Sequence, residues 1–105
     1  MTDLSERLDR LRRLLAGKKM EALLVSQPDN RRYLSGFDGS AGLLLITRRD
    51  NVLATDSRYT EQARRQAPDY EILEIKGNWG GWMPALASRL GLKELHFEAE
   101  HLTFV

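Results

Sequence analysis

The sequence predicts an α/β fold with a mixed, roughly five-stranded sheet flanked by helices. Apolar runs typical of buried strands alternate with amphipathic stretches typical of helices. Two of these runs are separated only by Arg48 to Asn51, which is too short for a parallel crossover and predicts an antiparallel hairpin. A length of 105 residues, with 42% hydrophobic and 30% charged residues, predicts one globular domain over residues 1–105.

Composition narrows the classes of function. The net charge is +1, which gives no global field for nucleic acid or an anionic membrane. The chain has no cysteine, so it has neither disulfides nor thiolate chemistry. It shows no apolar signal segment and no run near the roughly 20 residues of a membrane span. We therefore expect a cytoplasmic protein without nucleic-acid or membrane partners.

The first elements follow from residue spacing. A leucine stripe at spacings of three and four predicts a helix over residues 3–16, with Gly17 as its C-terminal cap. A short apolar run predicts a strand buried on both faces at 21–26, and Pro28 is placed to open a short helix through Tyr33. The later elements are strands at 42–47, 52–55, 71–75 and 95–98, a helix from Asp56 or Ser57 to Ala67, and a helix at 83–90 ended by Gly91. Thr103 looks like the cap of another helix, so we expect a piece of a longer protein.

Residues 30–42 organise the chain. They lie between two apolar runs, and their polar and glycine-rich composition predicts that they are not core. Gly36, Gly39 and Gly42 permit positive φ. A second polar cluster, residues 55–59, follows the next apolar run. Polar clusters at the ends of apolar runs are typical of a binding edge in an α/β protein.

The sequence lacks the residue patterns that most catalytic mechanisms require. The only histidines are His96 and His101, and no metal-ligand pattern surrounds either, so we predict no metal site in this chain. No serine lies near a histidine in the sequence or in a G-x-S-x-G elbow. The loop at 38–42 resembles a phosphate loop only in its glycine count. No catalytic residue is predicted.

Arg58 and Trp79 each leave two interpretations open. We expect Arg58 in the first turn of a helix just past a strand, where its guanidinium could hold a ligand carboxylate or carbonyl through two parallel hydrogen bonds. It could equally form a structural ion pair with Asp56 or Glu61. Trp79, on a predicted loop, could be an interface anchor or a core residue.

Several motifs in order carry a family resemblance. They are Asn30-Arg31-Arg32-Tyr33-Leu34-Ser35-Gly36-Phe37, then Gly39-Ser40-Ala41-Gly42, then Thr55-Asp56-Ser57-Arg58-Tyr59 with Gln62-Ala63, and late Phe97-Glu98-Ala99-Glu100-His101-Leu102-Thr103. With these motifs the chain resembles, over essentially its whole length, the N-terminal domain of Xaa-Pro aminopeptidases and prolidases, the creatinase/prolidase N-terminal domain.

The resemblance implies a ribonuclease-H-like fold and a role in a larger metallopeptidase. Relatives carry a C-terminal pita-bread domain that holds two divalent metals, commonly manganese, and all catalytic groups. The N-terminal domain overhangs that site, contributes to substrate selection and makes subunit contacts in dimers or tetramers. The chain alone is therefore expected to bind no catalytic metal and to hydrolyse nothing.

The resemblance also suggests site residues. It implies that Arg58 reaches the peptide substrate, that Tyr33, Phe37 and Asp38 lie near the same cleft, and that Trp79 could close a neighbouring subunit's site. Two alternatives stay open: a peptide-binding module from a catalytically inactive relative, and the N-terminal domain of a creatinase-type enzyme acting on a guanidino substrate. Metal ligands downstream of this sequence would separate the alternatives.

Overall fold

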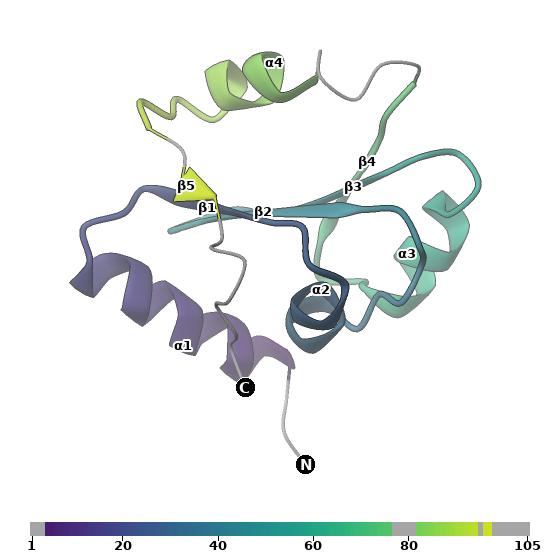
Figure 1. Ribbon diagram of the computed structural model, residues 1–105, viewed down its shortest axis with the longest axis horizontal. Helices are drawn as coiled ribbons and strands as arrows, with labels where there is room; N and C mark the ends of the chain where they lie inside the picture. Colours follow the sequence, from purple (N-terminus) through teal and green to yellow (C-terminus); the bar gives the residue numbers. More distant parts are fainter. Residues whose placement is uncertain (1–3, 77–81, 95, 98–105) are drawn as a thin grey trace.

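Five strands form one mixed sheet with helices on both faces (Figure 1). The computed structural model describes residues 4–76, 82–94 and 96–97. The elements are α1 (Leu4–Gly17), β1 (Ala22–Val25), α2 (Pro28–Ser35), β2 (Leu43–Thr47), β3 (Asn51–Thr55), α3 (Thr60–Gln66), β4 (Glu71–Glu74), α4 (Trp82–Arg89) and β5 (His96–Phe97). The predicted α/β class with its five-stranded sheet is confirmed.

The strand order is β4-β3-β2-β1-β5. The two central pairs, β1 with β2 and β2 with β3, are antiparallel, and the outer pairs are parallel. The hairpin predicted from the short connection after β2 is therefore confirmed. In its register Leu43 lies opposite Ala54, so the residues that precede β2 and the residues that follow β3 meet at the same edge of the sheet.

Apolar side chains cover both faces of the central strands. Figure 1 shows α1, α2 and α3 on one face of the sheet and α4 on the other. In β1, Leu23 and Val25 join the cluster under α1, while Ala22 and Leu24 join the cluster that includes Leu86 of α4. The predicted burial of this strand on both faces is confirmed.

The C-terminal end of α1 differs from the sequence prediction. Gly17 is the last residue of α1 rather than a left-handed cap, and Lys19 takes the left-handed conformation with φ 58°. Met20 N–H then donates to the Leu15 carbonyl at 2.9 Å, which closes the helix with a six-residue turn. In contrast, Gly91 has φ +71° after α4, as predicted for a glycine that ends a helix.

The helix predicted to begin at Asp56 or Ser57 begins later. A turn covers residues 57–59, and α3 starts at Thr60 without a side-chain cap. Asp56 Oδ1 accepts the Arg58 backbone N–H at 3.0 Å, so this carboxylate caps the turn instead of the helix.

Within the described residues, no helix is long and apolar enough to cross a membrane.

Candidate functional site

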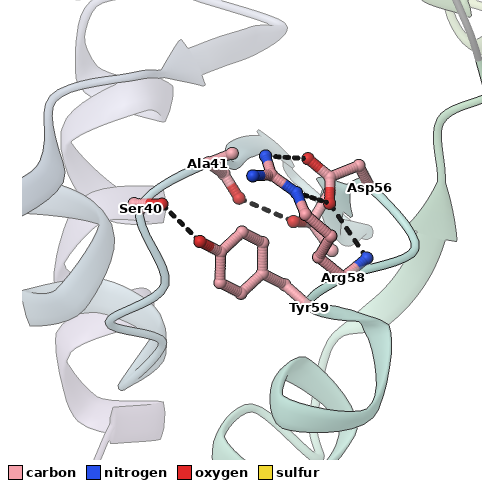
Figure 2. A network of polar contacts seen from close by, with 6 residues as sticks. Ser40, Ala41, Asp56, Arg58 and Tyr59 are labelled. Atoms are coloured by element: carbon pink, nitrogen blue, oxygen red, sulfur yellow. Dashed lines mark hydrogen bonds and ion pairs between the residues drawn. The ribbon is translucent and has the colours of Figure 1, made fainter.

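The candidate site joins the loop after α2 to the turn after β3. The Ser40 and Tyr59 hydroxyls hydrogen-bond to each other across the gap, and Thr55 Oγ1 donates to the Ala41 carbonyl at 2.6 Å (Figure 2). Thr55 is fully buried, and its bond to the loop is partly buried. The two polar clusters identified in the sequence are therefore adjacent, as expected from their positions at the two ends of one hairpin.

Arg58 lies in the turn, two residues before α3, and not in the first turn of the helix as predicted. Its Nε and Nη2 donate to Oδ1 and Oδ2 of Asp56 at 3.0 and 2.8 Å (Figure 2). Of the two ion-pair partners considered from the sequence, the structure selects Asp56. The Arg58 side chain is nevertheless 68% exposed, against 19% for Asp56. The ion pair and an exposed ligand-binding position are therefore compatible.

The pairing shifts the pKa of both groups. Hydrogen bonds from the Arg58 side chain hold the pKa of Asp56 below its usual value of 3.8. The hydrogen bonds to the Asp56 carboxylate raise the pKa of Arg58 above its usual value. The pair is therefore fully ionised near neutral pH, with one group of each sign.

The Tyr59 ring packs against the Arg58 guanidinium. The Arg58 Cζ lies 5.1 Å from the Tyr59 ring centroid, within range of a cation–π interaction. The same ring meets Phe37 edge to face, with centroids 6.2 Å apart. Arg58 is thus connected to the hydrophobic core through one aromatic side chain whose hydroxyl is tied to Ser40.

Residues 30–42, which the sequence predicted to lie outside the core, contain some of its most buried side chains. Phe37 is fully buried, and Leu34 is 1% exposed. A Cβ on Gly39 would come within 2.3 Å of the Phe37 ring, and one on Gly42 within 3.0 Å. These two glycines are required by close packing on Phe37, while Gly36 alone of the three has positive φ, at +83°.

Arg31 is a buried arginine that the sequence analysis did not identify. It is 5% exposed and extends from α2 beneath the loop. Its Nη1 donates to the carbonyls of Ser26 and Gly42, and its Nη2 donates to the carbonyl of Gly39, each at 2.9 Å. A single planar guanidinium thus ties the end of β1 to both ends of the loop that carries Ser40.

The other site residues that the family resemblance suggests lie in different environments. Phe37 belongs to the core and has no exposed surface, so it packs beneath the loop, and its assignment to the site stays a prediction. Tyr33 is half-buried against α1, where the Arg7 Cζ lies 4.5 Å from its ring centroid. Trp79 lies outside the described residues.

Asp38 remains at the site and is exposed. Its Oδ1 accepts Gln62 Nε2 at 2.8 Å, and its backbone N–H donates to Gln66 Oε1 at 3.2 Å. Both glutamines lie on α3, so these bonds give the loop further attachments to the segment that follows Arg58. The loop and the turn therefore form one connected polar unit.

No metal-binding cluster occurs in the described part of the chain. Among residues 4–76, 82–94 and 96–97, no three His, Cys, Asp or Glu side chains are grouped so that they could hold an ion. The unit formed by the loop and turn offers hydrogen-bond donors and acceptors for a peptide or another polar ligand. Nothing in it activates a nucleophile.

Comparison with known proteins identifies the class. The profile of the Creatinase/Prolidase N-terminal domain matches residues 7–105, and the chain belongs to this family. It is similar to an Xaa-Pro dipeptidase from Bacillus anthracis, with a TM-score of 0.88 and 34% identity over 96% of this chain and 28% of that chain. The predicted family and fold class are thereby confirmed.

Two further solved structures share this fold. An Xaa-Pro aminopeptidase from Streptococcus pyogenes has a TM-score of 0.85 and 37% identity over 96% of this chain and 77% of that chain. The N-terminal domain of cytoplasmic peptidase PepQ from Mycobacterium tuberculosis has a TM-score of 0.81 and 42% identity over 93% of this chain and 76% of that chain. The present chain spans 28% of the full length of each of two curated bacterial relatives.

Proposed function

We propose that this chain is the substrate-contacting N-terminal domain of an Xaa-Pro aminopeptidase, and that Arg58 binds the peptide. The observation that carries this proposal is the exposed Arg58 guanidinium held in place by Asp56 and Tyr59. An arginine in fixed orientation can donate two parallel hydrogen bonds to a carbonyl or carboxylate at little further entropic cost.

The surroundings of Arg58 support a binding role over a purely structural one. A surface ion pair contributes little to stability, about 0–1 kcal/mol, and does not require further hydrogen bonds to neighbouring segments. Here the turn and its two flanking elements are attached to the preceding loop: Tyr59 of the turn bonds to Ser40, Thr55 of β3 to Ala41, and Gln62 of α3 to Asp38. Preorganisation of this kind lowers the cost of binding a ligand, which is the advantage of a fixed donor at a substrate site.

The hydrolytic chemistry is assigned to a separate catalytic domain of the parent protein. Two divalent metal ions, with manganese the expected metal, would supply that chemistry there. We propose that residues 1–105 act as one non-catalytic domain of that protein, and among the described residues no His, Cys, Asp or Glu side chains are grouped so that they could hold a metal ion. We further propose a homodimeric or tetrameric parent and a cytoplasmic location, the latter supported by the similarity to the cytoplasmic peptidase PepQ.

The test compares the parent protein with the present 105-residue chain. Both are incubated with manganese and an Xaa-Pro-Xaa tripeptide, and release of the first residue is followed. Cleavage by the parent alone is expected. Cleavage by neither protein would reject the peptidase assignment and favour a peptide-binding module or a creatinase-type enzyme. Cleavage by the short chain would contradict its assignment as a non-catalytic domain.

A further inference from the structure

The Asp56–Arg58 pair leaves one edge of the guanidinium available. Both carboxylate oxygens of Asp56 are engaged by Nε and Nη2 of Arg58, so the pairing is side-on (Figure 2). A guanidinium has five N–H bonds, and this geometry uses two of them. For the residues the structure describes, no hydrogen bond involves Nη1 of Arg58, and the edge formed by Nη1 and Nη2 can still donate two parallel hydrogen bonds.

That edge belongs to a pair with no net charge. The negative charge of Asp56 lies at the adjacent Nε–Nη2 edge of the Arg58 guanidinium, with a shortest N–O distance of 2.8 Å. A ligand carboxylate at the open edge is attracted by Arg58 and repelled by Asp56, whereas a neutral carbonyl escapes most of the repulsion. The pair therefore discriminates against a negatively charged ligand group more strongly than a lone arginine would.

The charge of the carbonyl group of proline differs between two kinds of substrate. In an Xaa-Pro dipeptide the carbon after the proline ring is a carboxylate, while in a longer peptide it is an amide. An amide presents a carbonyl acceptor beside an N–H donor. The carbonyl complements the Arg58 guanidinium, and the N–H complements the Asp56 carboxylate. Asp56 already accepts three N–H groups of Arg58, and a carboxylate has about four acceptor positions, so one remains for such an N–H.

We infer that Asp56 is a specificity-determining residue, which through its pairing with Arg58 favours peptides that continue beyond proline over Xaa-Pro dipeptides. The inference rests on the proposed function, because it requires the group after proline to meet Arg58. It goes beyond that function by assigning Asp56 a part in choosing between two substrate classes.

The test uses the parent protein and two substrates that differ only in this group, Ala-Pro and Ala-Pro-amide. The measured quantity is the ratio of kcat/KM for the amide to kcat/KM for the acid. Asp56→Asn keeps an oxygen that can cap the turn but removes the charge, and it should lower this ratio about threefold or more. The change should shrink as salt is added, because ions screen exposed charges.

Asp9→Asn on α1 provides the matched control. Asp9 is exposed and lies outside the site, and its substitution changes the net charge by the same amount as Asp56→Asn, so it should leave the ratio unchanged. Arg58→Ala distinguishes failure of the specificity inference from failure of the proposed function. If Arg58→Ala slows both substrates while Asp56→Asn leaves the ratio unchanged, the specificity inference is overturned and the proposed function survives. If Arg58→Ala affects neither substrate, the proposed function fails, and the specificity inference fails with it.

Discussion

Replacement of Arg31 by alanine should destabilise the domain more than any surface substitution nearby. Arg31 donates three hydrogen bonds to main-chain carbonyls, and those to Gly39 and Gly42 are buried. The bond to Ser26 is only partly buried, so water can replace it. Arg31→Ala therefore leaves at least two buried acceptors without the donor they have in the native fold.

The magnitude follows from the cost of unsatisfied buried groups. Each one costs about 1–3 kcal/mol, so two give a loss in the free energy of unfolding of about 2–6 kcal/mol. A domain of this size has a total stability of about 5–15 kcal/mol. At about 4–8 °C for each kcal/mol, the melting temperature should fall by roughly 10 °C or more.

Arg32 supplies the control because it is the next residue in α2 and is exposed. Circular dichroism melts of the isolated chain should place Arg32→Ala within about 3 °C of the unmodified protein, since surface substitutions usually change stability by less than 0.5 kcal/mol. Arg31→Lys should fall between the two, because an ammonium lacks the planar fork that reaches all three carbonyls. Equal melting temperatures for Arg31→Ala and Arg32→Ala would refute the structural role of Arg31.

Two further predictions concern the core. Gly39→Ala should lower the free energy of unfolding by about 1–3 kcal/mol, because its Cβ would come 2.3 Å from the Phe37 ring. The control is Gly17→Ala, whose Cβ meets nothing within 4 Å, so this variant should be neutral or stabilising. Equal urea midpoints for the two variants would contradict the packing of Gly39 on Phe37. Tyr70→Phe should cost about 1 kcal/mol near neutral pH, because the hydroxyl donates to a buried carbonyl at 3.0 Å. Burial raises the pKa of Tyr70, so its contribution is complete below the unfolded pKa near 10 and is lost above it at up to about 1.4 kcal/mol per pH unit. The variant should therefore lose less stability than the unmodified protein between pH 10 and 11, and parallel urea-unfolding curves would count against this assignment.

Periodicity and turn chemistry were sufficient to predict most of the fold. The leucines at positions 8, 11 and 15 are buried, as their spacing predicts, and Pro28 opens α2. The short connection after β2 determined the antiparallel hairpin, and that hairpin places the two polar clusters at one edge. The proximity of the two polar clusters, one of which contains Arg58, could therefore be predicted from local signals combined with one topological rule.

Other features depended on tertiary contacts that local patterns do not encode. Composition favoured a position outside the core for residues 30–42, but Phe37 enters the core and Arg31 donates buried hydrogen bonds to the carbonyls of Gly39 and Gly42. An arginine in a polar stretch is exposed in most sequences, so nothing marked Arg31 as buried. The predicted start of α3 was also wrong, because the Asp56 carboxylate accepts hydrogen bonds from the backbone and side chain of Arg58 in the turn and does not cap the helix.

The most direct test of the central claim is the effect of Arg58→Ala on peptide hydrolysis by the parent protein. Arg48→Ala, at an exposed position in the β2–β3 turn, serves as the control. Loss of a charged hydrogen bond to the substrate should lower kcat/KM for an Xaa-Pro-Xaa tripeptide about 10- to 100-fold, with unchanged melting temperature. Equal kcat/KM for Arg58→Ala, Arg48→Ala and the unmodified protein would contradict the claim that Arg58 binds the peptide.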